Sequence, residues 1–214
     1  MIIEIEGVDG CGKHTQAKKL YEHLTAKGYK CKLISFPNYE SGSSTPVKMY
    51  LNGDIGENMD CLDPYQACAI FAVDRLVTMK QIENEEFDFI ILDRYVGSLI
   101  VHHASRIDNA SQRSKYIEWV ENLEYNILKI PRPDKVLFLD MPIEMSLKLK
   151  RERSELKNGM SKDIMEEDEE KLIIASNSAK KVAETLGWIK IDCGQKELKS
   201  IDEIHEEILT KLGV

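Results

Sequence analysis

The pattern that most limits how this chain can fold is GVDGCGKHT, from Gly7 to Thr15. It matches the phosphate-binding motif G-x-x-x-x-G-K-[ST] through Lys13, but His14 stands where a hydroxyl residue is usual, and Thr15 follows one position later. In this motif, glycines let the backbone approach a phosphate, and successive amides converge on its oxygens at the positive end of a helix. The motif indicates phosphoryl transfer or simple nucleotide binding only if it joins a strand to a helix.

That context is present. MIIEIE at Met1–Glu6 predicts a strand, and TQAKKLYEHLTAKG at 15–28 predicts a helix, with Leu20 and Leu24 one turn apart and Gly28 as its stop signal. The motif therefore lies between the first predicted strand and the first predicted helix, where a chance match is uncommon.

Four more segments, YKCKLISFP, FDFIILDRY, DKVLFLDM and WIKIDCG, predict strands, and the near-continuous apolar character of FDFIILDRY and DKVLFLDM is typical of strands covered on both faces. Asp63 and Pro64 predict the N-cap and first turn of a long helix ending near Glu86, and Ser200 with Glu203 has the capping-box spacing of a last helix. Strands that alternate with helices predict an α/β fold. We expect one domain, 1–214, with the three layers of a P-loop NTPase: a mainly parallel five-stranded sheet flanked by helices.

Charge and cysteine content limit the function classes. A net charge of −8 and a pI near 5.3 argue against a general nucleic-acid binder, which normally carries a basic excess. No apolar run approaches the roughly 20 residues of a membrane span, and the N-terminal segment lacks the signal-peptide pattern. The five cysteines are scattered, without metal-binding spacing. We therefore expect a cytoplasmic protein with reduced thiols and with neither a nucleic-acid nor a membrane partner.

An acidic residue ends the strand in IILDRYVGS. Asp93 resembles the strand-end carboxylate that positions Mg²⁺ in phosphate-loop enzymes, and Arg94 adds a cation where open parallel sheets bind their ligands. The alternative is that the two side chains only pair with each other or cap the next helix.

The long predicted helix carries Phe71 and Arg75 four residues apart, and hence on one face. The ring can stack on a flat ligand while the guanidinium holds an anion. An aromatic residue on a helix is more often part of the core, so this pair gains weight only beside the phosphate motif.

A basic segment follows VLFLDMPIEMSLKLK. It holds Arg151, Arg153, Lys157 and Lys162 before the sequence turns acidic. One interpretation is a solvated charged surface. The other is a mobile lid, at about 151–165, that closes over a polyphosphate and delivers an arginine to the transferring group.

Taken together, EGVDGCGKHTQ, FPNY, FAVDR, DRYVGS and KDIMEED resemble, in order and approximate spacing, the motifs of thymidylate kinases over essentially the whole chain. The base-reading N-K-x-D of GTPases and the long lid insert of adenylate kinases are absent. The resemblance implies ATP- and Mg²⁺-dependent phosphorylation of dTMP to dTDP, on the route to dTTP, by a homodimer.

The resemblance also implies residue roles. Glycine at Gly10 is typical of the bacterial subtype, which supplies its catalytic arginine from the lid. Phe71 would stack on thymine, and Arg75 and Arg94 would bind the dTMP phosphate. The implied ATP-binding residues are Gly7, Val8, Asp9, Gly10, Cys11, Gly12, Lys13, His14 and Thr15; the catalytic residues are Lys13, Arg94, Arg153 and Arg151; the acceptor-binding residues are Asp9, Phe36, Tyr39, Phe71, Arg75, Arg94 and Ser98.

For the metal, we expect Mg²⁺ to be held chiefly by ATP and water, with Asp93 and Asp9 or Glu166 nearby. Leu99 and His102 stand where relatives often carry a polar base-reading residue and a tyrosine, which leaves the preference for dTMP over dUMP open. Two alternatives remain: another nucleoside or deoxynucleoside monophosphate kinase, and a non-catalytic nucleotide switch. A switch has no use for a second phosphate-binding site.

Overall fold

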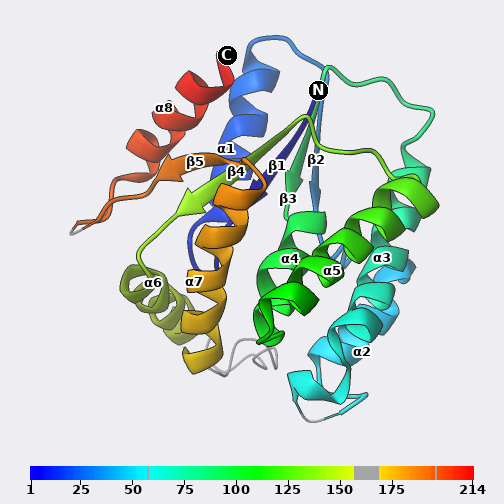
Figure 1. The fold of residues 1–214 in the computed structure, drawn as a ribbon. Helices are drawn as coiled ribbons and strands as arrows, with labels where there is room; N and C mark the ends of the chain where they lie inside the picture. The colour runs from blue at the N-terminus through cyan, green and yellow to red at the C-terminus, as the bar shows by residue number, and fades with distance from the viewer. Residues whose placement is uncertain (57, 157–168, 196) are drawn as a thin grey trace.

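The structure, a computed structural model, describes residues 1–56, 58–156, 169–195 and 197–214. Its strands are β1 (Ile2–Glu6), β2 (Cys31–Ser35), β3 (Phe89–Asp93), β4 (Lys135–Asp140) and β5 (Ile189–Asp192). They form one sheet in the order β2-β3-β1-β4-β5, and every neighbouring pair is parallel (Figure 1). The predicted five-stranded α/β sheet is confirmed, and β1 lies at its centre.

Helices cover both faces of the sheet (Figure 1). On one face lie α1 (Lys13–Ala26) and α8 (Ile201–Leu212); on the other lie α3 (Pro64–Gln81), α4 (Val96–His103), α5 (Ala110–Glu121) and α7 (Glu169–Thr185). The short α2 (Thr45–Leu51) packs on α3, and α6 (Ile143–Leu156) contacts α7. A π-helical turn, Asn122–Ile127, follows α5 directly. None of the described helices has the length and apolar character needed to cross a membrane.

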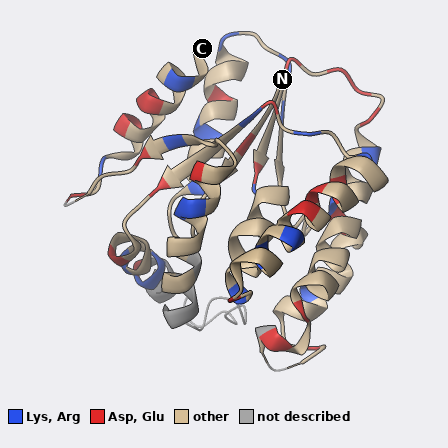
Figure 2. Cartoon of the chain, in the orientation of Figure 1, with Lys and Arg blue, Asp and Glu red and all other residues tan. Residues whose placement is uncertain are grey.

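The side chains of β1 alternate between two environments. Ile3 and Ile5 are fully buried in the same core as Leu20 and Leu24 of α1, which explains the predicted one-turn spacing of those leucines. Figure 2 shows most charged residues on helices and loops around the sheet. The buried glutamates of β1 are therefore unusual, and they face α4.

Capping residues set the helix ends largely as predicted. The Asp63 carboxylate accepts hydrogen bonds from the amides of the first turn of α3, and the Gln66 side-chain oxygen accepts one from the amide of Asp63. Ser200 and Glu203 form the expected capping box of α8. The predicted end of α3 near Glu86 is wrong. This helix ends at Gln81, because 83–86 is exposed and rich in glutamate, with no apolar face to pack.

Candidate active site

The phosphate loop joins β1 to α1 at the carboxyl end of the central strand. Gly7, Gly10 and Gly12 have φ values of 151°, 86° and 87°, which favour glycine. A Cβ on Gly10 would lie 2.5 Å from the carbonyl oxygen of Ser146, so glycine is what lets α6 approach the loop. The predicted strand–loop–helix context is confirmed for all nine residues from Gly7 to Thr15.

Two cations of this site flank Asp9. Lys13 Nζ donates to two loop carbonyls at 2.7 and 2.8 Å and lies 3.7 Å from Asp9 Oδ1. Arg94 Nη2 donates to the same carboxylate oxygen, while its Nη1 lies 3.4 Å from His102 Nε2. Burial alone raises the pKa of Asp9, but Arg94, His102 and Lys13 together hold this pKa well below its usual range. Asp9 is therefore an anion shared by two phosphate-binding candidates.

His14 occupies the position at which this motif usually carries a hydroxyl residue. Its Nδ1 lies 2.9 Å from Asp93 Oδ2, although the imidazole is otherwise exposed. Ser35 Oγ donates to the same Asp93 oxygen at 3.2 Å. Thr15 is exposed in the first turn of α1, so its hydroxyl is accessible to solvent beside the phosphate loop.

The carboxylates of Asp9 and Asp93 offer some of the oxygen ligands that Mg²⁺ prefers, but not a complete set. Asp93 Oδ1 and Asp9 Oδ2 accept no hydrogen bond from the described residues. Mg²⁺ prefers such oxygens but normally completes its shell with water and substrate phosphates. Within the part of the chain that the structure describes, no group of three histidine, cysteine or carboxylate side chains could hold a metal by itself. The residues present therefore fit Mg²⁺ only together with a nucleotide.

The FPNY segment forms a wall beside these charges. Phe36 is buried after β2, with its ring 5.4 Å from that of Tyr95. The amide of Asn38 donates to Asp74 Oδ2 at 2.8 Å, which anchors the segment to α3. Tyr39 remains 49% exposed, so its ring is accessible to solvent.

Phe71 and Arg75 share a face of α3, but they differ in accessibility. Phe71 is half-buried, 5.9 Å from the ring of His103. Arg75 is 2% exposed; its Nε donates to Glu124 Oε1 at 3.1 Å, and its Nη2 donates to the same oxygen. Burial alone lowers the pKa of Arg75, but Glu124 raises this pKa and keeps the guanidinium charged. Only Nη1 of Arg75 has no hydrogen-bond partner among the described residues.

The remaining predicted site residues are Ser98, Arg151, Arg153 and Glu166. Ser98 Oγ donates to Glu6 Oε1 at 2.7 Å, so this serine is held by β1. Arg151 is exposed on α6. The side chain of Arg153, Glu166 and most of the predicted lid lie outside the described residues.

Several residues of the site were not predicted from the sequence. Glu6, Glu124 and Asp74 are buried carboxylates that hold the predicted residues in place. His103 packs against Phe71, and the Cβ of Lys150 lies 3.5 Å from where a Cβ of Gly10 would be. The one available sequence signal was a charged residue at a position where the strand pattern predicts burial, as for the two glutamates of IIEIE.

Comparisons with known proteins agree with this geometry. A sequence model of the family described as thymidylate kinase matches residues 5–208. A thymidylate kinase of Mycobacterium tuberculosis is 34% identical over 174 residues, 79% of each chain, and that of Homo sapiens is 27% identical over 97% of this chain and 87% of its own. A solved thymidylate kinase from Candida albicans superposes with a TM-score of 0.71 at 23% identity, covering 99% of this chain and 90% of its own. The chain therefore belongs to the thymidylate kinase family of phosphotransferases.

Proposed function

We propose that the protein transfers the γ-phosphoryl group of ATP to dTMP, giving ADP and dTDP for dTTP synthesis. The observation that carries this proposal is the meeting of Lys13, in the phosphate loop, with Arg94, from the end of β3, on the two sides of Asp9. A nucleotide switch needs one phosphate site, whereas a kinase needs one for the donor and one for the acceptor.

In this proposal the loop amides and the N-terminus of α1 hold the ATP phosphates. Lys13 exchanges its loop carbonyls for the β- and γ-phosphates, and Arg94 with Nη1 of Arg75 orients the acceptor phosphate against them. A dTMP phosphate oxygen then forms a bond to the γ-phosphorus as the bond to ADP breaks. Catalysis is mainly positioning and charge stabilisation. Mg²⁺ would neutralise part of the phosphate charge when ATP is bound; ATP and water would chiefly hold it, with Asp93 and Asp9 or Glu166 nearby.

Acceptor choice depends on residues that depart from the family pattern. Leu99 is 2% exposed and packs in the core, so its side chain reads no base. His102 stands beside Asp9 and Arg94, and burial lowers its pKa to about 4, so it is neutral near pH 7. We propose that dTMP is preferred but that dUMP is also accepted.

Coupled measurement of ADP release against dTMP, dUMP, dCMP and AMP tests the function. We expect dTMP to be fastest, and Lys13→Ala to lower kcat by about a hundredfold or more with little change in the dTMP dissociation constant. Faster turnover of another monophosphate would replace dTMP as the substrate. ATP binding without ADP release for any acceptor would favour the switch.

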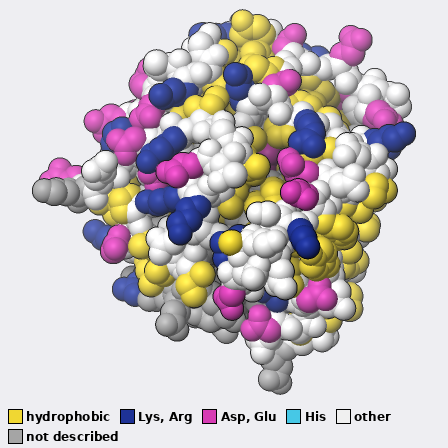
Figure 3. Space-filling model, viewed as in Figure 1, with side chains coloured by type: hydrophobic (Ala, Val, Ile, Leu, Met, Phe, Trp, Pro, Cys, Tyr) yellow, Lys and Arg dark blue, Asp and Glu magenta, His cyan; other side chains and the backbone are white. Residues whose placement is uncertain are grey.

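We also propose a cytoplasmic homodimer. Ala69, Val73 and Val77, four residues apart along α3, are all exposed and form one apolar stripe. Figure 3 shows hydrophobic side chains gathered on the side of the molecule where Figure 1 places α3 and α2. Such a patch is typical of a protein–protein interface. All five cysteines are free thiols, as suits a reducing compartment.

A further inference from the structure

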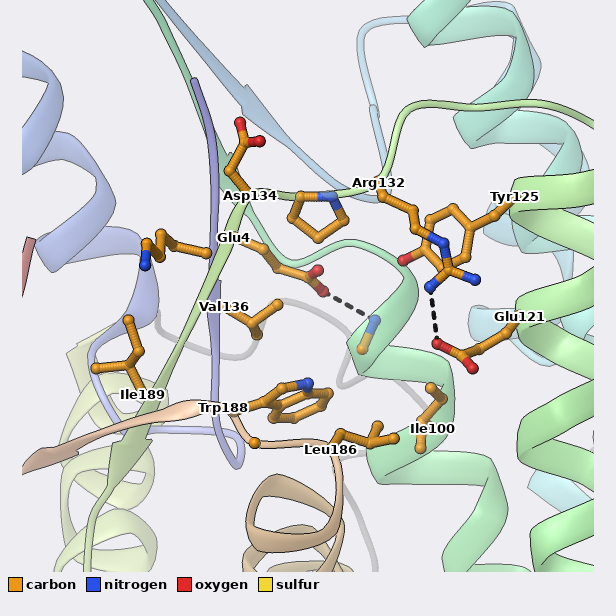
Figure 4. Close-up of a pocket in the computed structure, with 14 residues that line it drawn as sticks. Glu4, Ile100, Glu121, Tyr125, Arg132, Asp134, Val136, Leu186, Trp188 and Ile189 are labelled. Atoms are coloured by element: carbon orange, nitrogen blue, oxygen red, sulfur yellow. Dashed lines mark hydrogen bonds and ion pairs between the residues drawn. The ribbon is translucent and has the colours of Figure 1, made fainter.

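Two adjacent carboxyl groups lie inside the molecule directly before the phosphate loop. Glu4 and Glu6 are 1% and 0% exposed on the face of β1 that looks toward α4. Figure 4 shows Glu4 reaching from β1 to the start of α4, where a dashed line marks its bond to the helix backbone. The cavity drawn there, of about 300 Å³, lies at the amino ends of β4 and β5, away from the phosphate loop. Burying two carboxyl groups is costly unless each has partners.

Most of their hydrogen-bond partners lie at the start of α4, while the Gly7 amide donates to Glu6 Oε2 at 3.4 Å. The N-cap residue of this helix, Tyr95, gives no side-chain cap, and Glu6 Oε1 instead accepts from the Tyr95 amide at 3.1 Å and from Ser98 Oγ at 2.7 Å. Glu4 Oε1 accepts from the Gly97 amide at 2.8 Å. Two carboxyl groups of the central strand thus cap a helix that lies 89 or more positions later in the sequence.

The two groups differ in charge. Burial and the neighbouring Glu6 raise the pKa of Glu4 well above its usual range, and a side-chain hydrogen bond to Glu6 adds to that rise. Burial also raises the pKa of Glu6, but Lys13, Arg94, Ser98 and the Tyr95 amide oppose this rise by stabilising its anion. The hydrogen bond between the two carboxyl groups needs one proton, and the neighbouring Lys13, Arg94, Ser98 and Tyr95 favour keeping that proton on Glu4 and the negative charge on Glu6.

That charge lies behind Arg94, whose backbone is unusual. Arg94 has φ 67°, a left-handed conformation that residues other than glycine seldom adopt. Its amide donates to the carbonyl of Ile5 at 3.2 Å, and the next amide, of Tyr95, donates to Glu6. Asp9 holds the guanidinium, whereas β1 holds the backbone that presents it.

We propose that Glu6 is a positioning residue for the acceptor phosphate: its buried carboxylate locks the turn from Arg94 to Ser98 and supplies a counter-charge for Arg94. This inference rests on the proposed function, in which Arg94 binds the dTMP phosphate. Glu6 touches no substrate and acts through Arg94 and Ser98. A site whose cations are preassembled in this way loses less free energy to reorganisation when a charged substrate binds.

The test compares Glu6→Gln with Glu4→Gln, the same change at two neighbouring positions on one face. A glutamine at position 4 keeps an oxygen for the Gly97 amide and an N–H for Glu6, and it replaces the group whose neutral form is favoured by burial and by Glu6. A glutamine at position 6 keeps the shape but removes the charge. We expect Glu6→Gln to raise KM for dTMP about tenfold or more, with KM for ATP changing less than about threefold, and Glu4→Gln to keep both KM values within about threefold of the original.

Further measurements separate the possible failures. If Glu6→Gln keeps the dTMP KM while Arg94→Ala raises it, the inference is overturned and the proposed function stands. If the unmodified enzyme does not phosphorylate dTMP, the proposed function itself fails. Equal losses for dTMP and ATP, or equal effects of both glutamine variants, would show a merely structural role. Should Glu6→Gln not fold, Glu6→Asp keeps the charge but withdraws it from Tyr95 and Ser98; a dTMP KM unchanged there also overturns the inference.

Discussion

At the scale of single residues, Arg75 has two roles that one substitution removes together. Its guanidinium is proposed to bind the acceptor phosphate through Nη1, and it also neutralises Glu124, which is 0% exposed. Arg75→Ala therefore leaves a buried carboxylate without a partner. We expect this variant to raise KM for dTMP, with ATP binding near normal, and to lower the free energy of unfolding by about 3 to 5 kcal/mol, measured by denaturant titration.

A double variant, Arg75→Met with Glu124→Leu, separates the two roles. Replacing a buried ion pair by apolar residues of similar volume is often neutral for stability. We expect stability to return while the dTMP KM stays high. Recovery of dTMP binding in this variant would mean that Arg75 serves the fold alone.

At the scale of elements, helix α6 carries both positions predicted to supply a lid arginine, 151 and 153. Ser146 on α6 touches the loop, since its Oγ donates to the Asp9 carbonyl at 3.0 Å and its carbonyl lies beside Gly10. Position 153, seven residues later, returns to the same helix face, whereas position 151 lies about 140° away around the helix. We therefore expect Arg153 to supply the catalytic charge.

Arg153→Ala should lower kcat by about a hundredfold or more, and Arg151→Ala by less than about threefold, with melting temperatures unchanged. The double variant should behave like Arg153→Ala. Full activity of the double variant would identify the segment as a solvated surface, and a dominant loss from Arg151→Ala would reverse the assignment.

The apolar stripe of α3 carries the proposed dimer. Val73 is 48% exposed at its centre, and Val73→Glu places a charge where a second copy would pack. We expect this variant to sediment as a monomer. Ile201→Glu, an equally drastic change at a 53% exposed position on α8, is the matched control and should sediment like the original. A monomeric original protein, or a dimeric Val73→Glu, contradicts the proposal.

For the whole molecule, buried histidines predict sensitivity to acid. Burial lowers the pKa of His102 to about 4, and it also lowers the pKa of His103 and of His205. Below pH 6.5 these histidines are protonated in the unfolded chain but stay neutral in the folded protein. The free energy of unfolding is therefore highest above this pH and decreases as the pH falls. Each such ring costs up to about 1.4 kcal/mol per pH unit.

Unfolding titrations at pH 7.5 and 5.5 test this prediction through His103→Asn, in which an amide oxygen can still accept from Arg106 in place of Nδ1 at 3.1 Å. The variant should lose about 1 kcal/mol less than the original protein between the two pH values. An identical loss in both proteins would show that His103 does not contribute to the acid sensitivity.

The sequence alone determined those parts of the protein that depend on local pattern. The phosphate loop, the apolar strands and the capping residues Asp63 and Ser200 follow from motif spacing and from periods of two or 3.6 residues. Lys13, Asp93 and Arg94 could be selected because each stands at the end of a recognisable strand or at the start of a helix. The end of α3 was misjudged, because helix propensity continues past Gln81 where packing does not.

Only the tertiary structure decided which buried charges meet. Glu124 lies 49 positions from Arg75, and Glu6 lies 89 positions from Tyr95, so no local pattern links either pair. His14 and Asp93 come together because parallel strands bring their carboxyl ends to one edge of the sheet. A buried charge stays in the fold only when a partner from another element reaches it. That partner depends on how the chain packs. The positions of the cations in this site therefore follow from tertiary contacts and could not be deduced from residue spacing in the sequence.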